Sequence, residues 1–167
     1  VHPVFLPQDL LLAKVDGGYN AVQVEGYLVG RVLFYGQGAG PSATSSAVLA
    51  DVMDVAQRIN RGVSITPALR LDPSKRVMPI TDIETRYYLR MLTVDRPGVL
   101  AKISKVMADN EISISSVIQK ESDVADDVEE IVLMTYPALE KAMQQAMGQI
   151  SRLDVMKEIA SFVRVED

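Results

Sequence analysis

The stretch "YYLRMLTVDRPGVLAKISKVMADNEISISSVIQKE" (residues 87–121) changes its periodicity twice and decides the fold of the second half of the chain. Residues 87–94 are rich in aromatic and β-branched side chains and predict a strand. Pro97 and Gly98 predict a sharp turn, and apolar residues from Val99 to Met107 then recur at helical spacing. We expect this helix to end near Asn110 and a second strand to follow.

The elements after this helix complete a familiar order of strands and helices along the chain. Residues 128–135 predict a third strand, an apolar stripe over 139–153 predicts a long helix, and 159–165 predict a fourth strand. The order βαββαβ predicts a ferredoxin-like arrangement, a four-stranded antiparallel sheet with two helices on one face. In the second strand, alternation predicts one face with Ile112, Ile114 and Ile118, and another with Ser113, Ser115, Val117 and Gln119.

The first half of the chain predicts a hairpin, a glycine turn and a helix, so the whole chain is of the α+β class. In "YNAVQVEGYLVGRVLFYG" (residues 19–36), Gly26 and Gly30 bracket the hairpin turn. Ser42 or Thr44 is expected to cap the following helix. The apolar face of that helix repeats at helical spacing and consists of Val48, Val52, Val55 and Ile59.

Residues 61–86 separate the two halves. Three prolines (Pro67, Pro73 and Pro79) and scattered charges interrupt both helical and strand periodicity, which is typical of a linker. We therefore expect one domain portion over residues 1–80 and a second domain over residues 81–167. The chain begins at Val1 rather than Met, and we expect it to be a segment of a longer protein.

Composition excludes several classes of function. The 167 residues include no cysteine and a single histidine, His2, so no disulfide, zinc–thiolate site or cysteine nucleophile can form. The net charge of −5 and the absence of a basic stripe argue against nucleic-acid binding. No run approaches the ~20 apolar residues that cross a bilayer, and no signal pattern opens the chain. We expect a cytoplasmic protein that binds neither membrane nor nucleic acid.

The run Gly36–Gly40 lies between a predicted strand and a predicted helix. It is not a dinucleotide fingerprint, because Pro41 stands where the third glycine would be. Its three glycines could still bring backbone N–H groups close to an anion at the helix N-terminus. Spacing alone favours the other interpretation, a tight strand-to-helix turn.

The loop Asp95–Gly98 has a similar geometry and could receive a small zwitterion. The helix that follows presents free N–H groups for a carboxylate, and Asp95 could accept from an ammonium group. Gln119 could donate to and accept from a polar ligand. The alternatives are a plain helix-entry turn and a solvated or interface glutamine.

No catalytic or metal site can be assembled from these residues. The chain offers no Ser-His-Asp or Cys-His set. The acids between residues 121 and 130 lack the glycine and final glutamate of a calcium loop, so a solvated hairpin turn is favoured there. These acids are Asp123, Asp126, Asp127, Glu129 and Glu130. We therefore expect neither a catalytic residue nor a metal ligand in this chain.

The stretch "RYYLRMLTVDRPGVLAKISKVMADNEISISSVIQ" (residues 86–119) resembles an ACT domain, the small-molecule sensor module attached to enzymes of amino-acid biosynthesis. The signature is a strand, then D-x-P-G-V-L, then a helix, and the resemblance extends to the end of the chain. The pieces "VHPVFLP", Asn20–Gly26 and Tyr35–Gly40 resemble the C-terminal part of the substrate domain of homoserine dehydrogenase. In this order, the combination resembles a bacterial homoserine dehydrogenase with an ACT tail.

The resemblance implies an NAD(P)-dependent oxidoreductase that interconverts aspartate 4-semialdehyde and homoserine in threonine and methionine biosynthesis. In that family the nucleotide-binding domain and the catalytic lysine lie upstream of this segment. The chain alone is therefore expected to be inactive and to hold no cofactor. The glycine turn approaches the cofactor in the family, which assigns cofactor contact to Gly38, Ala39 and Gly40 by resemblance.

The resemblance also implies that the ACT domain binds L-threonine as a feedback effector. It implies a homo-oligomer formed through the ACT sheet and substrate-domain contacts. An alternative is a non-catalytic amino-acid-binding or dimerisation module. The effector-binding residues implied by position in the ACT family are Asp95, Pro97, Gly98, Val99, Leu100, Asn110, Ile112 and Gln119.

Overall fold

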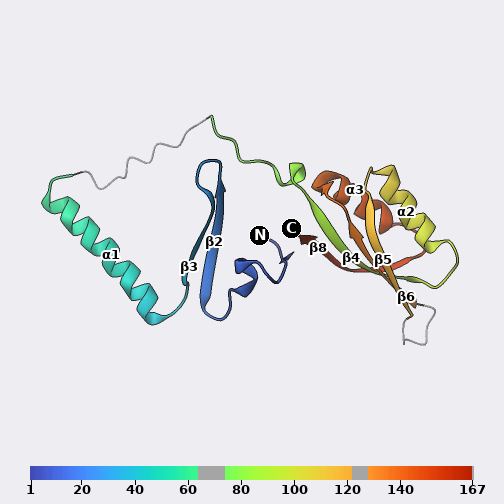
Figure 1. Cartoon of the computed structure of the whole chain (residues 1–167), viewed down its shortest axis with the longest axis horizontal. Helices are drawn as coiled ribbons and strands as arrows, with labels where there is room; N and C mark the ends of the chain where they lie inside the picture. The colour runs from blue at the N-terminus through green and yellow to red at the C-terminus, as the bar shows by residue number, and fades with distance from the viewer. Residues whose placement is uncertain (64–73, 122–127, 167) are drawn as a thin grey trace. The chain divides into compact units, whose positions relative to one another are not determined.

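The computed structural model describes residues 1–63, 74–121 and 128–166 (Figure 1). The chain divides into two compact units, one of Gln8–Arg76 and one of Val1–Pro7 together with Val77–Asp167. The domain boundary expected at residue 80 stays a prediction. Among the described residues, no helix is long and apolar enough to cross a membrane.

The unit Gln8–Arg76 contains the predicted hairpin and helix. Its elements are a 3-10 turn η1 (Leu11–Lys14), strands β2 (Tyr19–Gly26) and β3 (Gly30–Gln37), and helix α1 (Pro41–Asn60). The hairpin register pairs Gly26 with Gly30, as expected, and Gly30 adopts a φ of 70° that favours glycine. The hairpin and the helix are thus confirmed.

The cap predicted for α1 is wrong. The helix begins at Pro41, and Gly40 is its N-cap, with no capping hydrogen bond from a side chain. Ser42 and Thr44 therefore lie inside the first turn. Proline suits the first helical position because its φ is already helical and its missing N–H would have no intrahelical acceptor there.

The second unit has the predicted βαββαβ order. Its elements are η2 (Ile80–Asp82), β4 (Glu84–Val94), α2 (Val99–Asp109), β5 (Ile114–Glu121), β6 (Val128–Thr135), β7 (Ala138–Leu139), α3 (Glu140–Ile150) and β8 (Met156–Val165). The strands run antiparallel in the order β8-β4-β6-β5, and α2 and α3 cover one face of the sheet (Figure 1). The ferredoxin-like fold is confirmed.

The core of this unit lies between the sheet and its two helices. Alternate residues of β4 (Tyr87, Leu89 and Met91) face the helices and are fully buried. Ile103 of α2 and Met143 of α3 pack against them. Each such side chain contributes about 1.5–3 kcal/mol when it leaves water, so this layer stabilises the unit.

A strand that the sequence did not predict, β1 (Val4–Phe5), joins the free edge of β8. The pairing is parallel, Val4 lies opposite Arg164, and the backbone N–H of Glu166 donates to the carbonyl oxygen of Phe5 over 3.0 Å. The ring of Phe5 packs edge-on against Tyr88 with centroids 5.2 Å apart. The first residues of the chain therefore extend the sheet of the ACT-like unit.

The faces predicted for β5 are wrong beyond Ile114. The register shifts between Ile114 and Ser116, so Ser115 is an extra residue of a β-bulge. The shift places Val117 against the core, whereas Ile118 lies on the open face and is 53% exposed. A bulge exchanges the two faces of a strand, which a strictly alternating pattern does not anticipate.

Some predicted segments lie outside the described residues. They include Pro67 and Pro73 of the linker and the acids Asp123, Asp126 and Asp127 of the predicted turn. The described part of the linker contains Val77 and Met78, whose side chains are exposed.

Candidate effector site and cofactor turn

The loop between β4 and α2 is exposed and ends in a sharp helix entry. Asp95, Arg96, Pro97 and Gly98 are all exposed, and Gly98 is the N-cap of α2 with a φ of 93°. A side chain at that φ would strain the backbone, so glycine is required there. No side chain caps the helix.

The first turn of α2 leaves backbone donors available. The N–H of Val99 donates to the Arg96 carbonyl oxygen, and that of Lys102 donates to the Gly98 carbonyl oxygen. The N–H groups of Leu100 and Ala101 have no backbone acceptor in the part of the chain that the structure describes. Together with the positive end of the helix dipole, they could hold a carboxylate.

The Gln119 side chain lies on the face of the sheet that the helices cover, near this loop. It lies opposite Ile131, which in turn lies opposite Met91, and paired residues of antiparallel strands project to the same face. Its amide Nε2 donates to Oε1 of Glu129 over 2.9 Å. Glu129 is the partner of Thr93, two residues before the loop. The loop and Gln119 therefore occupy the same end of the sheet.

The charges near the loop are largely paired. Nζ of Lys102 lies 2.6 Å from a carboxylate oxygen of Asp154, and this hydrogen bond lowers the pKa of Asp154. Arg96 lowers the same pKa further. Because Asp154 already engages Lys102, the backbone donors of α2 are better placed than Lys102 to receive a ligand carboxylate.

Asn110 and Ile112 lie at the opposite end of α2. The helix has 11 residues, so at ~1.5 Å per residue its ends are about 16 Å apart. The Asn110 amide donates to the Val106 carbonyl oxygen and to Oε1 of Gln149, and the Ile112 side chain is buried in the core. The structure brings the loop together with Gln119 and leaves this pair apart from both.

The glycine turn before α1 depends on a close backbone contact. The N–H of Gly38 donates to the Gly18 carbonyl oxygen over 3.0 Å, and a Cβ at Gly38 would collide with the Asn20 side chain. Gly40 has a φ of 131° and open space around it. The turn therefore leaves open space only at Gly40 of these two glycines, next to the N-terminus of α1, where backbone N–H groups could approach an anion.

A buried charged cluster was not predicted from the sequence. Glu140 is fully buried and accepts hydrogen bonds from the Tyr87 hydroxyl (2.8 Å), Gln144 Nε2 (2.9 Å), and Nε (2.8 Å) and Nη2 of Arg164. Burial raises the pKa of Glu140, but the hydrogen bonds from Arg164, Gln144 and Tyr87 outweigh it and hold that pKa below its usual range. Burial, followed by the bond to Glu140, raises the pKa of Tyr87.

One signal in the sequence could have pointed to this cluster. Arg164 is the only charged residue between Ile159 and Val165, in the predicted last strand. A charge in such a strand is rarely buried without a partner. The partner, Glu140, is 24 residues away, and periodicity alone does not identify it.

The comparisons with known proteins cover both halves of the chain. Residues 1–53 match the sequence model of homoserine dehydrogenase, and residues 87–154 match that of the ACT domain. The homoserine dehydrogenase of Neisseria gonorrhoeae is 36% identical over 99% of the chain, and that of Mycobacterium bovis is 37% identical over 99%. The chain belongs to the homoserine dehydrogenase family. It spans about 39% of the length of the Neisseria relative.

Solved structures agree with this membership. The crystal structure of a homoserine dehydrogenase from Thiobacillus denitrificans is 36% identical, with a TM-score of 0.80 over 99% of this chain and 38% of that one. A homoserine dehydrogenase from S. aureus at 22% identity has a TM-score of 0.53 over 97% of this chain and 36% of that one, a likeness of fold alone. The chain corresponds to the C-terminal part of a homoserine dehydrogenase, ending in an ACT domain.

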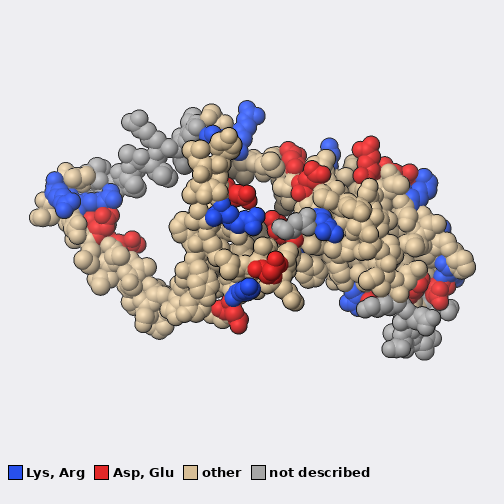
Figure 2. All heavy atoms as spheres, viewed as in Figure 1, with Lys and Arg blue, Asp and Glu red and all other residues tan. Residues whose placement is uncertain are grey.

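The homoserine dehydrogenase segment has an exposed apolar helix. None of the side chains of α1 is buried, and the spheres over α1 are mostly uncharged, with the charges gathered in its second half (Figure 2). Val52, Val55 and Ile59 line a shallow groove along the helix. Val55 is 39% exposed and Ile59 is 62% exposed. Exposed apolar surface of this kind is typical of protein–protein contacts.

Proposed function

We propose that this chain supplies the end of the substrate domain and the regulatory domain of an NAD(P)-dependent homoserine dehydrogenase. The enzyme would interconvert aspartate 4-semialdehyde and homoserine by hydride transfer. Family membership supports this activity, because relatives over 99% of the chain are homoserine dehydrogenases. The purified 167-residue chain is expected to show no turnover, since the catalytic lysine of the family has no counterpart assigned in it.

The glycine turn is proposed to contact the cofactor. Gly38, Ala39 and Gly40 would lie against NAD(P), with the free N-terminus of α1 behind them. When bound, the nicotinamide supplies the hydride chemistry, and these residues contribute shape and backbone donors. The open space around Gly40, at the N-terminus of α1, supports this proposal, whereas glycine is needed at Gly38 because a Cβ there would collide with the Asn20 side chain.

The regulatory site is proposed at the loop between β4 and α2, with L-threonine as the effector. The observation that carries this proposal is the pair of unpartnered N–H groups beside Gly98, on the same sheet end as Gln119. The backbone donors of Leu100 and Ala101 would hold the carboxylate, and Asp95 would accept from the ammonium group. Gln119 would read the threonine hydroxyl by hydrogen bonding.

The remaining residues of the predicted site take supporting roles in this proposal. Pro97 and Gly98 shape the loop, Val99 anchors it to the core, and Leu100 is half-buried in the first turn of α2. Asn110 and Ile112 lie too far along α2 to contact the same molecule in one chain. If they contact an effector, it is one held by a neighbouring copy in an oligomer.

Calorimetric titration with L-threonine tests the regulatory site, with L-lysine and L-isoleucine as comparison ligands. We expect selective threonine binding that Gln119→Ala weakens by about tenfold, the value of roughly one hydrogen bond. Gln145→Ala is the matched control, because Gln145 is an exposed amide on α3. Equal heats for all three amino acids, or equal weakening by both variants, would contradict the proposal.

A homo-oligomer is proposed through two surfaces. β5 pairs only with β6 among the described strands, and natural proteins usually cover such an edge. The apolar face of α1 is the second surface, and it would be covered by substrate-domain contacts with another copy. Both surfaces are self-complementary candidates for a symmetric assembly.

A non-catalytic amino-acid-binding or dimerisation module remains the second candidate. The observation that favours it is the self-contained core of the ACT unit, which needs no contact from the unit Gln8–Arg76. A parent gene without an upstream nucleotide-binding domain would support this candidate against the dehydrogenase.

A further inference from the structure

A pocket lies on the ACT unit, next to β1. It has a volume of about 350 Å³ and is lined from β1, the start of β4 and the end of β8. Its place in the sheet differs from that of the β4–α2 loop, which follows the other end of β4. A pocket of this size falls in the range of small-molecule sites.

Arg164 is the central polar group of this pocket. Its side chain is 15% exposed, and Nε and Nη2 are both bound by the buried carboxylate of Glu140. Its guanidinium carbon also lies 6.0 Å from the centroid of the Phe162 ring. These contacts fix the guanidinium plane, while Nη1 has no hydrogen-bond partner within the described ranges.

The fixed guanidinium presents a second edge to the pocket. Arginine carries five N–H donors in a planar fork, and the carboxylate of Glu140 occupies only one edge of that fork. The Glu140 carboxylate also accepts hydrogen bonds from the Tyr87 hydroxyl and the Gln144 amide, so Arg164 is not its only partner. Donors held rigidly before binding lose little conformational entropy when a carboxylate arrives.

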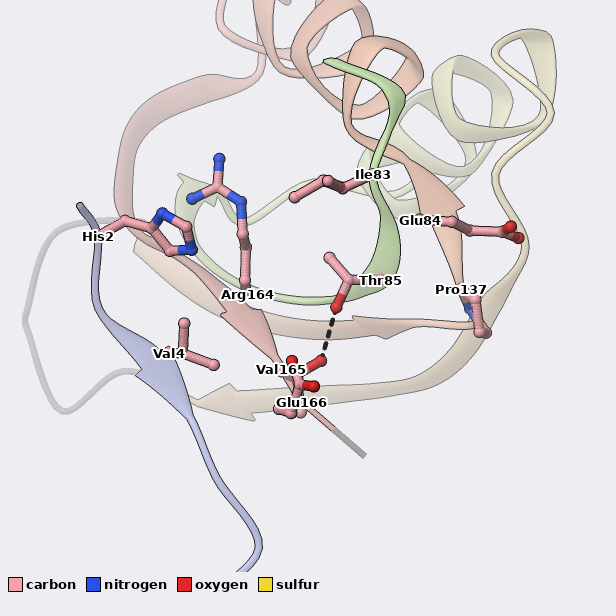
Figure 3. Close-up of a pocket in the computed structure, with 9 residues that line it drawn as sticks. All are labelled: His2, Val4, Ile83, Glu84, Thr85, Pro137, Arg164, Val165 and Glu166. Carbon is pink, nitrogen blue, oxygen red and sulfur yellow. Dashed lines mark hydrogen bonds between the residues drawn. The ribbon is translucent and has the colours of Figure 1, made fainter. Parts of the chain in front are cut away.

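The other lining groups define what fits beside Arg164. Figure 3 shows the His2 imidazole and the Arg164 guanidinium on one side of the pocket, with the Ile83 side chain extending toward them. Glu166 and Glu84 also line it, and the Glu84 carboxylate points away from the pocket. The Thr85 hydroxyl donates a hydrogen bond to the Val165 carbonyl oxygen over 2.8 Å. The lining thus offers donors on one side and a carboxylate, Glu166, for a cation.

We propose that this pocket binds a small zwitterion of the α-amino acid class. The ligand carboxylate meets the free edge of Arg164 and the N–H of His2, and its ammonium group faces Glu166. A simple anion would leave Glu166 repelling it, and a simple cation would face Arg164 without compensation. The proposal is independent of the threonine site, because none of these residues belongs to the loop Asp95–Gly98.

The site lies beside the junction of β1 and β8. Val4, which lines the pocket, pairs with Arg164 itself, and the next pair is Phe5 with Val165. A ligand here would therefore contact residues of both strands and stabilise the β1–β8 pairing.

The test is a titration of the ¹⁵N-labelled 167-residue chain, followed through its amide NMR signals. L-Alanine is the probe, and propionate and ethylamine are matched controls that each lack one of its two charged groups. We expect L-alanine to shift the amides of residues 83–85 and 164–166 to saturation. Propionate should bind more weakly, and ethylamine should leave these signals unchanged.

Three variants separate this pocket from the threonine site. Arg164→Lys removes the planar fork and should weaken L-alanine binding about tenfold. His2→Ala, at an exposed residue that the fold does not need, should weaken it several-fold even if Arg164→Lys fails to fold. Gln119→Ala should leave it unchanged.

Two outcomes would overturn the proposal. One is an L-alanine response confined to residues 95–100, which would place its only site at the β4–α2 loop. The other is an ethylamine response equal to that of L-alanine. Failure of the threonine site alone would instead leave residues 95–100 without a response to L-threonine, while the L-alanine response at residues 83–85 stayed intact.

Discussion

Glu140 is a carboxylate that the fold removes from water and surrounds with donors. Tyr87, Gln144 and Arg164 supply four hydrogen bonds between them. Its backbone N–H donates to the Ile83 carbonyl oxygen, so the residue also ties the start of α3 to the segment before β4. A buried charge that loses its partners is costly, and this cluster is therefore sensitive to substitution.

Glu140→Gln should lower the free energy of unfolding by about 3 kcal/mol, because it leaves the largely buried Arg164 without its counter-charge. Chemical denaturation followed by circular dichroism measures the change. Asp109→Asn is the matched control: Asp109 forms an exposed pair with Lys105 on α2, and its loss should cost less than about 0.5 kcal/mol. Equal losses for the two variants would contradict this assignment.

The same carboxylate predicts a dependence on pH. Its pKa lies below the ordinary value of 4.5, so the folded state favours the charged form. The stabilisation is complete above that ordinary value and is lost as the pH falls through the folded pKa. The difference in unfolding free energy between the wild type and Glu140→Gln should therefore shrink when the pH is lowered from 7 toward 3.

Single residues differ in how far the sequence reveals them. Gly98 is readable, because Pro-Gly before an apolar helix implies a left-handed entry, and the structure has it. Gln119 is readable as a polar residue on a strand. The pairing of Arg164 with Glu140 is not readable, since it depends on which side chains the folded sheet and α3 bring together. The pocket beside Arg164 also depends on β1, and the two residues of β1 are too few to show a strand pattern in the sequence.

Among the elements, β5 departs most from its sequence pattern. Its bulge leaves the buried Ser115 hydroxyl without a hydrogen-bond partner among the described residues. Beyond the bulge, Val117 packs on the core and Ile118 faces outward. Because of the bulge, the Gln119 side chain lies on the face of the sheet that α2 and α3 cover.

Paired lysine substitutions test this bulge. Val117→Lys should destabilise the chain by about 3 kcal/mol or more, because it places an unpaired charge against the core. Ile118→Lys should cost less than about 1 kcal/mol, because that side chain is largely exposed. Thermal unfolding of the two variants measures the difference. A larger loss of stability for Ile118→Lys than for Val117→Lys would contradict the bulge and support the unbroken alternation that the sequence suggests.

Other elements follow closely from local rules. The third strand has the bounds predicted from the sequence, and α2 begins at Val99, where the Pro-Gly turn predicts it. Periodicity succeeds there because each element buries one face against a core built from its own neighbours. It fails at β1, whose pairing is decided by the free edge of β8 rather than by its own residues.

At the scale of the whole molecule, the two units bury their apolar side chains very differently. The ACT unit has a closed core, whereas α1 and the hairpin leave residues such as Val22 and Phe34 exposed. The sequence correctly predicts the apolar stripe of α1, but a stripe cannot identify what covers it. Family membership supplies the explanation that we propose, contact with further protein in the assembled enzyme.

Light scattering tests the proposed association of this chain with itself. Val55→Asp should shift the mean mass toward the monomer, because it places a charge in the apolar groove of α1. Gln57→Asp, on the opposite side of the helix, adds the same charge and should leave the mass unchanged. A monomeric wild type would contradict the proposal.

The pairing of β1 with β8 joins residues that lie far apart in the chain. Val4 meets Arg164, a separation of 160 residues (164 − 4). A ribosome that adds about 5–20 residues per second needs on the order of ten seconds to make the intervening chain. Until β8 has been made, β1 lacks the strand with which it pairs, so the ACT sheet acquires this outermost strand only after residues 156–165 have been synthesised. Translation order therefore places the joining of these two segments after the synthesis of every element that lies between them.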